Sequence, residues 1–311
     1  MTEFTTRSGA AVPRWAFGTM QFGDKADVAA SRAMYEACRE AGIRHFDTAW
    51  VYTEGRSEEI LGDLVGADRD ELFIATKVGM TGGAGRDTIR KQLDESLARL
   101  KMPAVDLLYI HIHDPETPMA ETVAALAEVK TEGRARHLAL SNYASWQVMQ
   151  MQHLARDAGT RVAALQPMYN LVKRQAEVEL LPMCQDQDIL PVPYSPLAGG
   201  LLTGKYMEGG TGRLTESDMY RKRYAIQGMH EAAKALSSLA AEAGTHPATL
   251  AAAWVARHPS RPAPILSARS AEQLAPSLAA IDYRLDDALY AKLSELYPAP
   301  PPATDRLEEV T

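Results

Sequence analysis

Short apolar runs alternate with longer amphipathic segments along nearly the whole chain. A short uninterrupted apolar run is typical of a strand that is covered on both faces. Such runs predict strands near residues 15–19, 44–48, 72–77, 105–111, 136–141, 162–166, 189–194 and 263–267. Apolar residues at helical spacing predict helices near residues 26–41, 57–65, 87–100, 118–132, 145–158, 175–187, 229–243, 247–258 and 271–280.

The regular alternation of these elements decides the fold class. Eight strands separated by helices predict an α/β protein with a (β/α)8 barrel, and we expect residues 1–311 to form this one domain. Local signals support several helix ends. Ser57 and Ser145 stand where N-caps are expected, and Gly42 follows an apparent helix end.

Two segments depart from this alternation. The stretch from Ser195 to Gly228 is rich in glycine and too long for an ordinary loop between a strand and a helix. We expect this long loop after the seventh strand to fold over the barrel mouth and to cover what binds there. The proline-rich sequence near 298–303 indicates that residues 298–311 form a flexible tail.

Composition narrows the class of partner. The 311 residues are 46% apolar and carry a formal net charge of -7, which argues against nucleic acids and anionic membranes and favours small molecules. Cys38 and Cys184 are the two cysteines, and the polar N-terminal sequence lacks the apolar core of a secretory signal. No apolar run is long enough to span a bilayer. We therefore expect a cytoplasmic protein.

Four side chains suited to acid–base chemistry on a carbonyl group stand where predicted strands end. Asp47, Lys77 and His111 close separate apolar runs, and Tyr52 lies in the loop just after the first of them. The strands of a parallel barrel end at one mouth, so these residues are expected to share a pocket. Taken alone, Asp47 and Lys77 could equally form a buried structural ion pair, and Tyr52 could be a rim aromatic.

The motifs along this scaffold, taken together, resemble the aldo-keto reductase superfamily over nearly its whole length. The resemblance is closest to the branch of aflatoxin-aldehyde and succinic-semialdehyde reductases. The matching stretches are F-G-T-M-Q-F-G (17–23), D-T-A-W-V-Y-T-E-G-R-S-E-E-I-L-G (47–62), A-T-K (75–77), V-D-L-L-Y-I-H (105–111), L-S-N-Y-A-S-W (140–146), M-Y-N-L-V-K-R-Q (168–175), S-P-L-A-G-G-L-L-T-G-K-Y (195–206) and S-A-E-Q-L (270–274). Their joint order and spacing make coincidence improbable.

The resemblance implies a catalytic tetrad for hydride transfer to a carbonyl group. Tyr52 is implied to be the general acid that protonates the carbonyl oxygen, with Lys77 favouring its phenolate and Asp47 orienting Lys77. His111 is implied to donate a hydrogen bond to the same oxygen. His113, two residues further on, is an alternative for this role, although the family pattern places the catalytic histidine at His111.

The resemblance also implies NADPH/NADP+ as the cofactor. No G-x-G-x-x-G sequence follows the first predicted strand, so a Rossmann-type site is not expected. By resemblance, Ser141, Asn142 and Gln166 hydrogen-bond the nicotinamide carboxamide, and Tyr194 stacks on the nicotinamide ring. On the residues alone, Ser141 and Asn142 could instead satisfy local turns.

The resemblance implies further cofactor contacts in three parts of the chain. They are Gly18, Thr19, Met20 and Asp47 near the first strands, Ser195, Leu197, Gly199 and Lys205 at the pyrophosphate, and Ser267, Arg269, Ser270, Gln273 and Ser277 at the adenosine. Arg269 and Ser270 open a helix, where a 2′-phosphate is well placed, so they are expected to favour NADPH over NADH. A solvated surface arginine is the alternative. Ser267 and Ser277 replace a glycine and an asparagine common in the family, which weakens the expected hold on adenine.

Substrate contacts are less clearly marked. The resemblance implies that Arg223, or Arg221 in its place, binds the carboxylate of an aldehyde, whereas a basic patch on an exposed helix explains these residues equally well. The remaining expected substrate contacts are Trp50, Tyr52, His111 and His113. The acidic C-terminus lacks the aromatic and arginine residues found in that branch, which removes a second expected anchor for a carboxylate.

Small-molecule carbonyl compounds are the expected partners, with the chain acting as a monomer or homodimer. No spacing typical of metal ligands is found, so no metal site is expected. Two alternatives to a reductase stay open. One is a cofactor-sensing partner protein with a reductase fold, as potassium-channel β subunits are, and the other is an unrelated lyase or isomerase that shares only the barrel.

Overall fold

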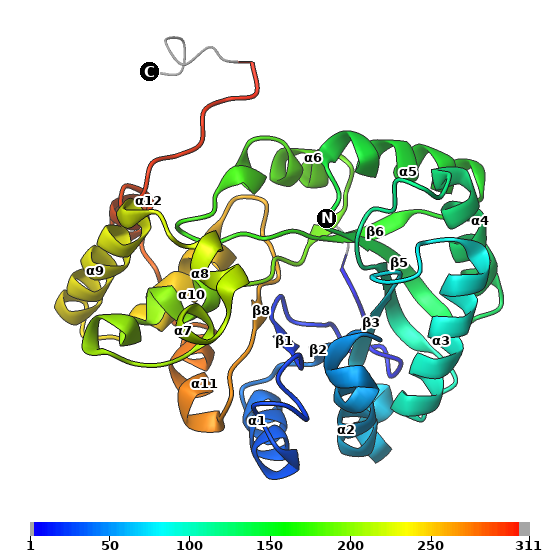
Figure 1. Cartoon of the computed structure of the whole chain (residues 1–311), viewed down its shortest axis with the longest axis horizontal. Helices are drawn as coiled ribbons and strands as arrows, with labels where there is room; N and C mark the ends of the chain where they lie inside the picture. Colours follow the sequence, from blue (N-terminus) through cyan, green and yellow to red (C-terminus); the bar gives the residue numbers. More distant parts are fainter. Residues whose placement is uncertain (1–2, 305–311) are drawn as a thin grey trace.

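Eight parallel strands form one sheet that curls into a barrel in the computed structural model, which describes residues 3–304 (Figure 1). The strands are β1 (Ala16–Gly18), β2 (His45–Asp47), β3 (Phe73–Val78), β4 (Val105–Ile110), β5 (Ala135–Ser141), β6 (Val162–Gln166), β7 (Leu190–Pro191) and β8 (Ile265–Leu266). Their order in the sheet is β7-β6-β5-β4-β3-β2-β1-β8. Backbone hydrogen bonds from Ala263 N to Pro191 O (2.8 Å) and from Ile265 N to Pro193 O (2.9 Å) join its two ends. The predicted (β/α)8 barrel is confirmed.

Helices surround the barrel and cover the outer face of the sheet (Figure 1). The helices of residues 3–304 are α1 (Val28–Glu40), α2 (Arg56–Val65), α3 (Arg86–Leu100), α4 (Met119–Thr131), α5 (Ser145–Asp157), α6 (Leu180–Asp186), α7 (Arg213–Glu216), α8 (Asp218–Arg223), α9 (Gln227–Glu242), α10 (Pro247–Arg257), α11 (Ala271–Leu278) and α12 (Asp287–Ser294). Of these, α7 and α8 lie at the mouth of the barrel. From α1 to α5 each helix packs on the next, and α11 packs on α1. Apolar side chains between this ring and the sheet form the larger core.

A second, smaller core fills the inside of the barrel. Small alanine side chains there leave room for large rings such as Phe73 and Tyr109. At the end of the barrel where the strands begin, the ring of Phe4 stacks on Phe73 with a centroid distance of 4.6 Å and lies 4.8 Å from His137. These rings form the floor of the barrel, so its opposite end, where the strands finish, carries the open mouth.

Prolines account for two differences between the predicted and observed elements. The seventh predicted strand reduces to β7, because Pro191 and Pro193 lack the N–H group that a regular ladder requires. The helix predicted over 175–187 is divided into a 3₁₀ turn, η3 (Gln175–Glu177), and α6. Pro182 lies in the first turn of α6, where a proline is tolerated, whereas it would disrupt the interior of one continuous helix.

The expected helix boundaries are confirmed in part. Gly42 follows α1 with φ of 81°, a conformation that glycine adopts at little cost. The N-cap assignments to Ser57 and Ser145 are wrong. Gly55 occupies the N-cap of α2 and Ala144 that of α5, so each serine lies inside its helix. The chain enters α2 through a left-handed turn, which places the cap two residues earlier than the serine suggests.

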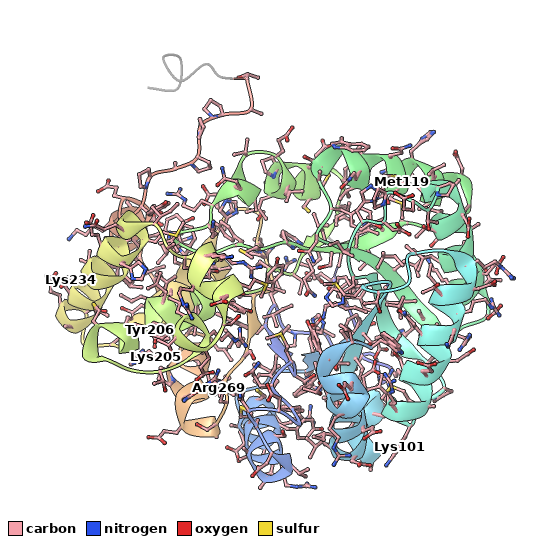
Figure 2. All side chains as sticks on the ribbon, viewed as in Figure 1. Lys101, Met119, Lys205, Tyr206, Lys234 and Arg269 are labelled. Atoms are coloured by element: carbon pink, nitrogen blue, oxygen red, sulfur yellow. The ribbon has the colours of Figure 1, made fainter. Side chains whose placement is uncertain are left out.

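The long segment after β7 contains short helices, although its high glycine content predicted a loop. It holds two 3₁₀ helices, η4 (Ala198–Thr203) and η5 (Lys205–Glu208), followed by α7 and α8. Figure 2 labels Lys205 and Tyr206 on this segment and Arg269 before α11. Of the predicted tail, residues 298–304 contain no helix or strand, and residues 305–311 lie outside the described residues.

Candidate active site

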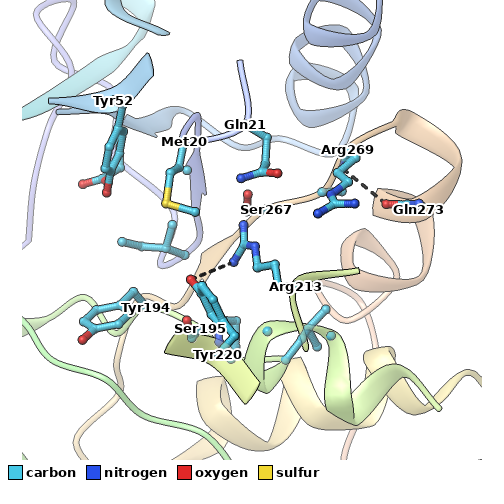
Figure 3. A pocket seen from close by; sticks show the side chains of 18 of the residues that line it. Met20, Gln21, Tyr52, Tyr194, Ser195, Arg213, Tyr220, Ser267, Arg269 and Gln273 are labelled. Atoms are coloured by element: carbon cyan, nitrogen blue, oxygen red, sulfur yellow. Dashed lines mark hydrogen bonds between the residues drawn. The ribbon is translucent and has the colours of Figure 1, made fainter. Parts of the chain in front are cut away.

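A cavity of about 870 Å³ opens at the mouth of the barrel. Its walls come from the ends of β1, β2, β5 and β6, from the long segment after β7 and from the residues between β8 and α11. Figure 3 shows Tyr52 and Met20 on one side of the cavity, Tyr194 and Tyr220 on another, and Arg269 further along. The strands thus bring together residues that are far apart in the sequence, as expected for a parallel barrel.

A buried ion pair lies at the base of this cavity. The Lys77 ammonium, which is fully buried, donates to the Asp47 carboxylate and to the backbone carbonyl of Thr48 (2.7 Å). The second Asp47 oxygen accepts from the Gln166 side-chain nitrogen at 2.9 Å. Both charges are therefore paired and hydrogen-bonded, which a buried pair needs if its desolvation is to be offset.

Tyr52 and His111 stand beside this pair. Their rings meet edge to face, with centroids 5.9 Å apart and an interplanar angle of 82°. The Lys77 nitrogen lies 5.1 Å from the centroid of the Tyr52 ring. All four predicted tetrad residues therefore come together in one place, although they derive from β2, the following turn, β3 and the end of β4.

The protonation states of these groups are set mainly by burial. Burial raises the pKa of Tyr52, and the charge of Lys77 opposes that rise. Burial, together with the smaller effect of the Lys77 charge, lowers the pKa of His111 to about 3, so this imidazole is neutral at pH 7. Burial by itself would lower the pKa of Lys77, but the charge of Asp47 and the hydrogen bonds with Asp47 and Tyr52 outweigh this effect, and the net pKa is raised. The site combines a protonated phenol, a neutral imidazole and an ammonium.

Next to the tetrad, a chain of polar side chains crosses the mouth. The Tyr194 hydroxyl donates to Asn142 Oδ1 (2.9 Å), and Asn142 Nδ2 donates to the His111 carbonyl (2.9 Å) and to Ser141 Oγ (3.1 Å). Asn142 has φ of 57°, a conformation that asparagine tolerates better than most residues. The amide nitrogen of Gln166 is already engaged by Asp47. These predicted nicotinamide contacts all line the cavity.

At the far end of the cavity, Arg269 forms a bidentate ion pair with Glu216 of α7. The two nitrogen–oxygen distances are 3.0 and 2.6 Å. Nearby, Ser270 caps α11 by accepting from the Gln273 backbone N–H, and the buried hydroxyl of Ser267 has no partner among the described residues. A phosphate group at this helix N-terminus would compete with Glu216 for the guanidinium of Arg269.

Most predicted cofactor residues line this cavity. They are Gly18, Met20, Asp47, Ser141, Asn142, Gln166, Tyr194, Ser195, Leu197, Gly199, Lys205, Ser267, Arg269, Ser270 and Gln273. Thr19 and Ser277 are buried outside its lining. The Thr19 hydroxyl instead lies 2.8 Å from that of Ser57, and Ser277 lies within α11.

The predicted substrate residues divide in the same way. Tyr52, His111 and Arg223 line the cavity, whereas Trp50 and His113 do not. The Trp50 indole donates to Glu95 of α3 (2.7 Å), and the His113 ring packs on Tyr143 at 5.3 Å. Both side chains thus contact residues that lie outside the cavity lining.

Sequence reasoning missed part of the basic and aromatic wall. Tyr220 lies in the cavity lining between Arg213 and Arg223, whose guanidinium carbons are 5.4 and 5.2 Å from its ring centroid. Arg221 is instead paired with Asp218 (3.1 Å) and is absent from the lining. The sequence M-Y-R-K-R-Y (219–224) contained the signal for Tyr220, but only the short helix α8 shows which side chains face inward.

Two other kinds of feature are absent from residues 3–304. No group of three or more His, Cys, Asp or Glu side chains is placed to hold a metal ion. No helix there has the length and apolar character needed to cross a membrane.

A (β/α)8 barrel whose mouth brings tyrosine, lysine, aspartate and neutral histidine together is suited to acid–base chemistry at a carbonyl group. The chain belongs to the aldo/keto reductase family, whose model matches residues 14–298.

Proteins with similar sequences include reductases, an oxidoreductase and a channel subunit. Aflatoxin B1 aldehyde reductase member 2 of Rattus norvegicus is 38% identical over 87% of this chain and 80% of its own length. The uncharacterized oxidoreductase YrpG of Bacillus subtilis is 33% identical over 94% of this chain and 95% of its own. A probable voltage-gated potassium channel subunit beta of Oryza sativa is also 33% identical, over 89% of both chains.

Proposed function

We propose that this protein reduces an aldehyde or ketone to an alcohol with NADPH, and that Tyr52 supplies the proton. The observation that carries the proposal is the placement of Tyr52, inside the cavity, beside the buried Lys77–Asp47 pair and the neutral His111. The names of the reductase relatives support the same reaction class.

Each tetrad residue has one task in this reaction. NADPH, when bound, supplies the hydride that the carbonyl carbon accepts. Tyr52 donates its proton to the carbonyl oxygen, and the Lys77 charge stabilises the phenolate that remains. His111, being neutral, donates a hydrogen bond from its ring N–H group to the same oxygen and aligns it. Asp47 holds Lys77 in place through the ion pair.

The direct test follows the near-ultraviolet absorbance of reduced nicotinamide while the protein is mixed with NADPH and a panel of carbonyl compounds. The panel contains succinic semialdehyde, 2-carboxybenzaldehyde, 4-nitrobenzaldehyde, methylglyoxal and simple ketones. We expect the absorbance to fall with at least one aldehyde. An absorbance that stays constant with every compound, although NADPH binds, contradicts the proposal.

Arg269 should determine the preference for NADPH. We expect Arg269→Ala to weaken NADPH binding by roughly 10- to 100-fold, since a bidentate pair with a phosphate is lost, and to change NADH binding by less than about threefold. Fluorescence titration measures both dissociation constants. The matched variant Glu216→Gln removes the carboxylate that occupies Arg269, so it should strengthen NADPH binding by about threefold. Equal losses for both cofactors in Arg269→Ala would place the 2′-phosphate elsewhere.

Arg223 is proposed to bind the carboxylate of an aldehyde substrate. Arg223→Ala should raise KM for succinic semialdehyde by roughly tenfold, because a charge-assisted hydrogen bond is lost, and leave KM for butanal unchanged. Steady-state kinetics with both aldehydes measure this difference. Arg221→Ala is the control, since Arg221 is exposed and paired with Asp218. If KM rises equally for the two aldehydes, Arg223 does not bind the carboxylate.

A second candidate function is a cofactor-sensing partner protein with little turnover. It is favoured by the relatives named as probable potassium channel β subunits. The absorbance test separates the two functions, because a sensor binds NADPH and leaves it reduced. The proposal also includes a cytoplasmic location, consistent with the buried, unpaired Cys38 and Cys184, and a monomeric or homodimeric state.

A further inference from the structure

The turn that carries Tyr52 has an unusual backbone. Thr53, Glu54 and Gly55 follow Tyr52 with φ values of 47°, 54° and 93°, so three consecutive residues are left-handed. Residues other than glycine adopt this region only at a cost, and they keep it where the surroundings hold them there. The residues that hold this turn therefore bear directly on where the Tyr52 phenol points.

Arg99 lies at the C-terminal end of α3 and makes contacts on both sides of the turn that carries Tyr52. Arg99 Nη1 donates to the Trp50 carbonyl at 3.0 Å on the side before Tyr52. The same nitrogen donates to Glu58 Oε2 at 3.2 Å on the side after it. A Cβ atom on Gly55 would overlap the Arg99 guanidinium, so the turn rests directly on this group.

Glu58 and Trp50 are themselves fixed. Glu58 is fully buried in α2, and its other oxygen accepts from the Thr76 hydroxyl at 2.6 Å, next to Lys77 on β3. The Trp50 ring lies 5.6 Å from the Arg99 guanidinium, and its indole nitrogen is bound by Glu95 of the same helix as Arg99. The contacts thus run from the Tyr52 turn to the strand that bears Lys77.

We propose that Arg99 is a positioning residue for Tyr52. It binds the backbone before the tyrosine and the buried carboxylate after it, which fixes the left-handed turn and aims the phenol at Lys77 and His111. Nothing in the reaction requires Arg99 to touch substrate or cofactor, and Arg99 is absent from the cavity lining. This inference rests on the proposed role of Tyr52 as proton donor.

The test compares Arg99→Ala with Arg90→Ala. Arg90 lies on the same helix and pairs with Glu132 of the segment after α4, away from the cavity, so it controls for the loss of an ion pair from α3. Arg99→Ala should lower kcat by roughly 10- to 100-fold, while KM for the aldehyde and the NADPH dissociation constant stay within about threefold. Millimolar guanidinium should restore part of this kcat, and urea at the same concentration should not.

Arg99→Lys gives a second measurement in case the alanine variant does not fold. One ammonium replaces the planar guanidinium, so kcat should again fall while KM is kept. If kcat of folded Arg99→Lys and Arg99→Ala equals that of Arg90→Ala, or if guanidinium rescues nothing, the positioning inference is wrong. A fully active Tyr52→Phe variant would instead remove the proposed role of Tyr52 as proton donor, whatever the Arg99 variants show.

Discussion

Replacing Tyr52 with phenylalanine should lower the rate of carbonyl reduction by roughly 10²- to 10⁴-fold and leave NADPH affinity within about threefold of the unmodified protein. The substitution deletes one hydroxyl and keeps the ring that packs against His111. The proton donor is lost, but the walls of the cavity are retained. Single-turnover measurements with bound NADPH report the chemical step directly, because they do not depend on product release.

The control for Tyr52→Phe is Tyr220→Phe. Tyr220 also lines the cavity, and it too would lose only a hydroxyl group. Its hydroxyl lies 3.5 Å from Arg213, at the opposite wall from the tetrad, so turnover should change by less than about threefold. Unchanged turnover in Tyr52→Phe, or an equal loss in both variants, would show that Tyr52 is not the proton donor.

Lys77→Met should damage both stability and turnover. It leaves the Asp47 carboxylate buried without its cation, which typically costs about 3–5 kcal/mol of unfolding free energy. It also removes the charge that opposes the rise in the pKa of Tyr52, so the phenol becomes a weaker acid. Urea unfolding measures the first effect, and steady-state reduction, expected to fall by roughly 10²-fold or more, measures the second.

The double variant Asp47→Asn, Lys77→Met separates these two effects. With the carboxylate neutralised, most of the lost stability should return, because no uncompensated charge is left in the barrel. Turnover should stay low, because the ammonium is still missing. A double variant that recovers both stability and turnover would show that Asp47 and Lys77 form only a structural ion pair.

The barrel and the tetrad could be predicted from sequence because both depend on local signals. Apolar runs mark the strands, and the end of each run places Asp47, Lys77 and His111 at one mouth once the sheet is known to be parallel. The eight strands were expected close to where they are found, and the largest shortening is at β7 and β8, where prolines interrupt the ladder and the barrel closes.

What could not be predicted depends on contacts between distant residues. No local pattern indicates that Glu216 engages Arg269, since the two residues are 53 positions apart. Trp50 was expected at the substrate because it lies near Tyr52 in sequence, yet its indole turns toward Glu95 of α3. The direction of a side chain in an irregular turn is set by its tertiary partners, and a sequence pattern carries little information about them.

The aromatic floor of the barrel limits how ligands enter and leave the cavity. Because Phe4, Phe73 and His137 fill the end where the strands begin, the cavity does not continue through the barrel and opens at the mouth. Any ligand bound at its base must enter and leave through the mouth, so a second ligand bound nearer the mouth would block its exit.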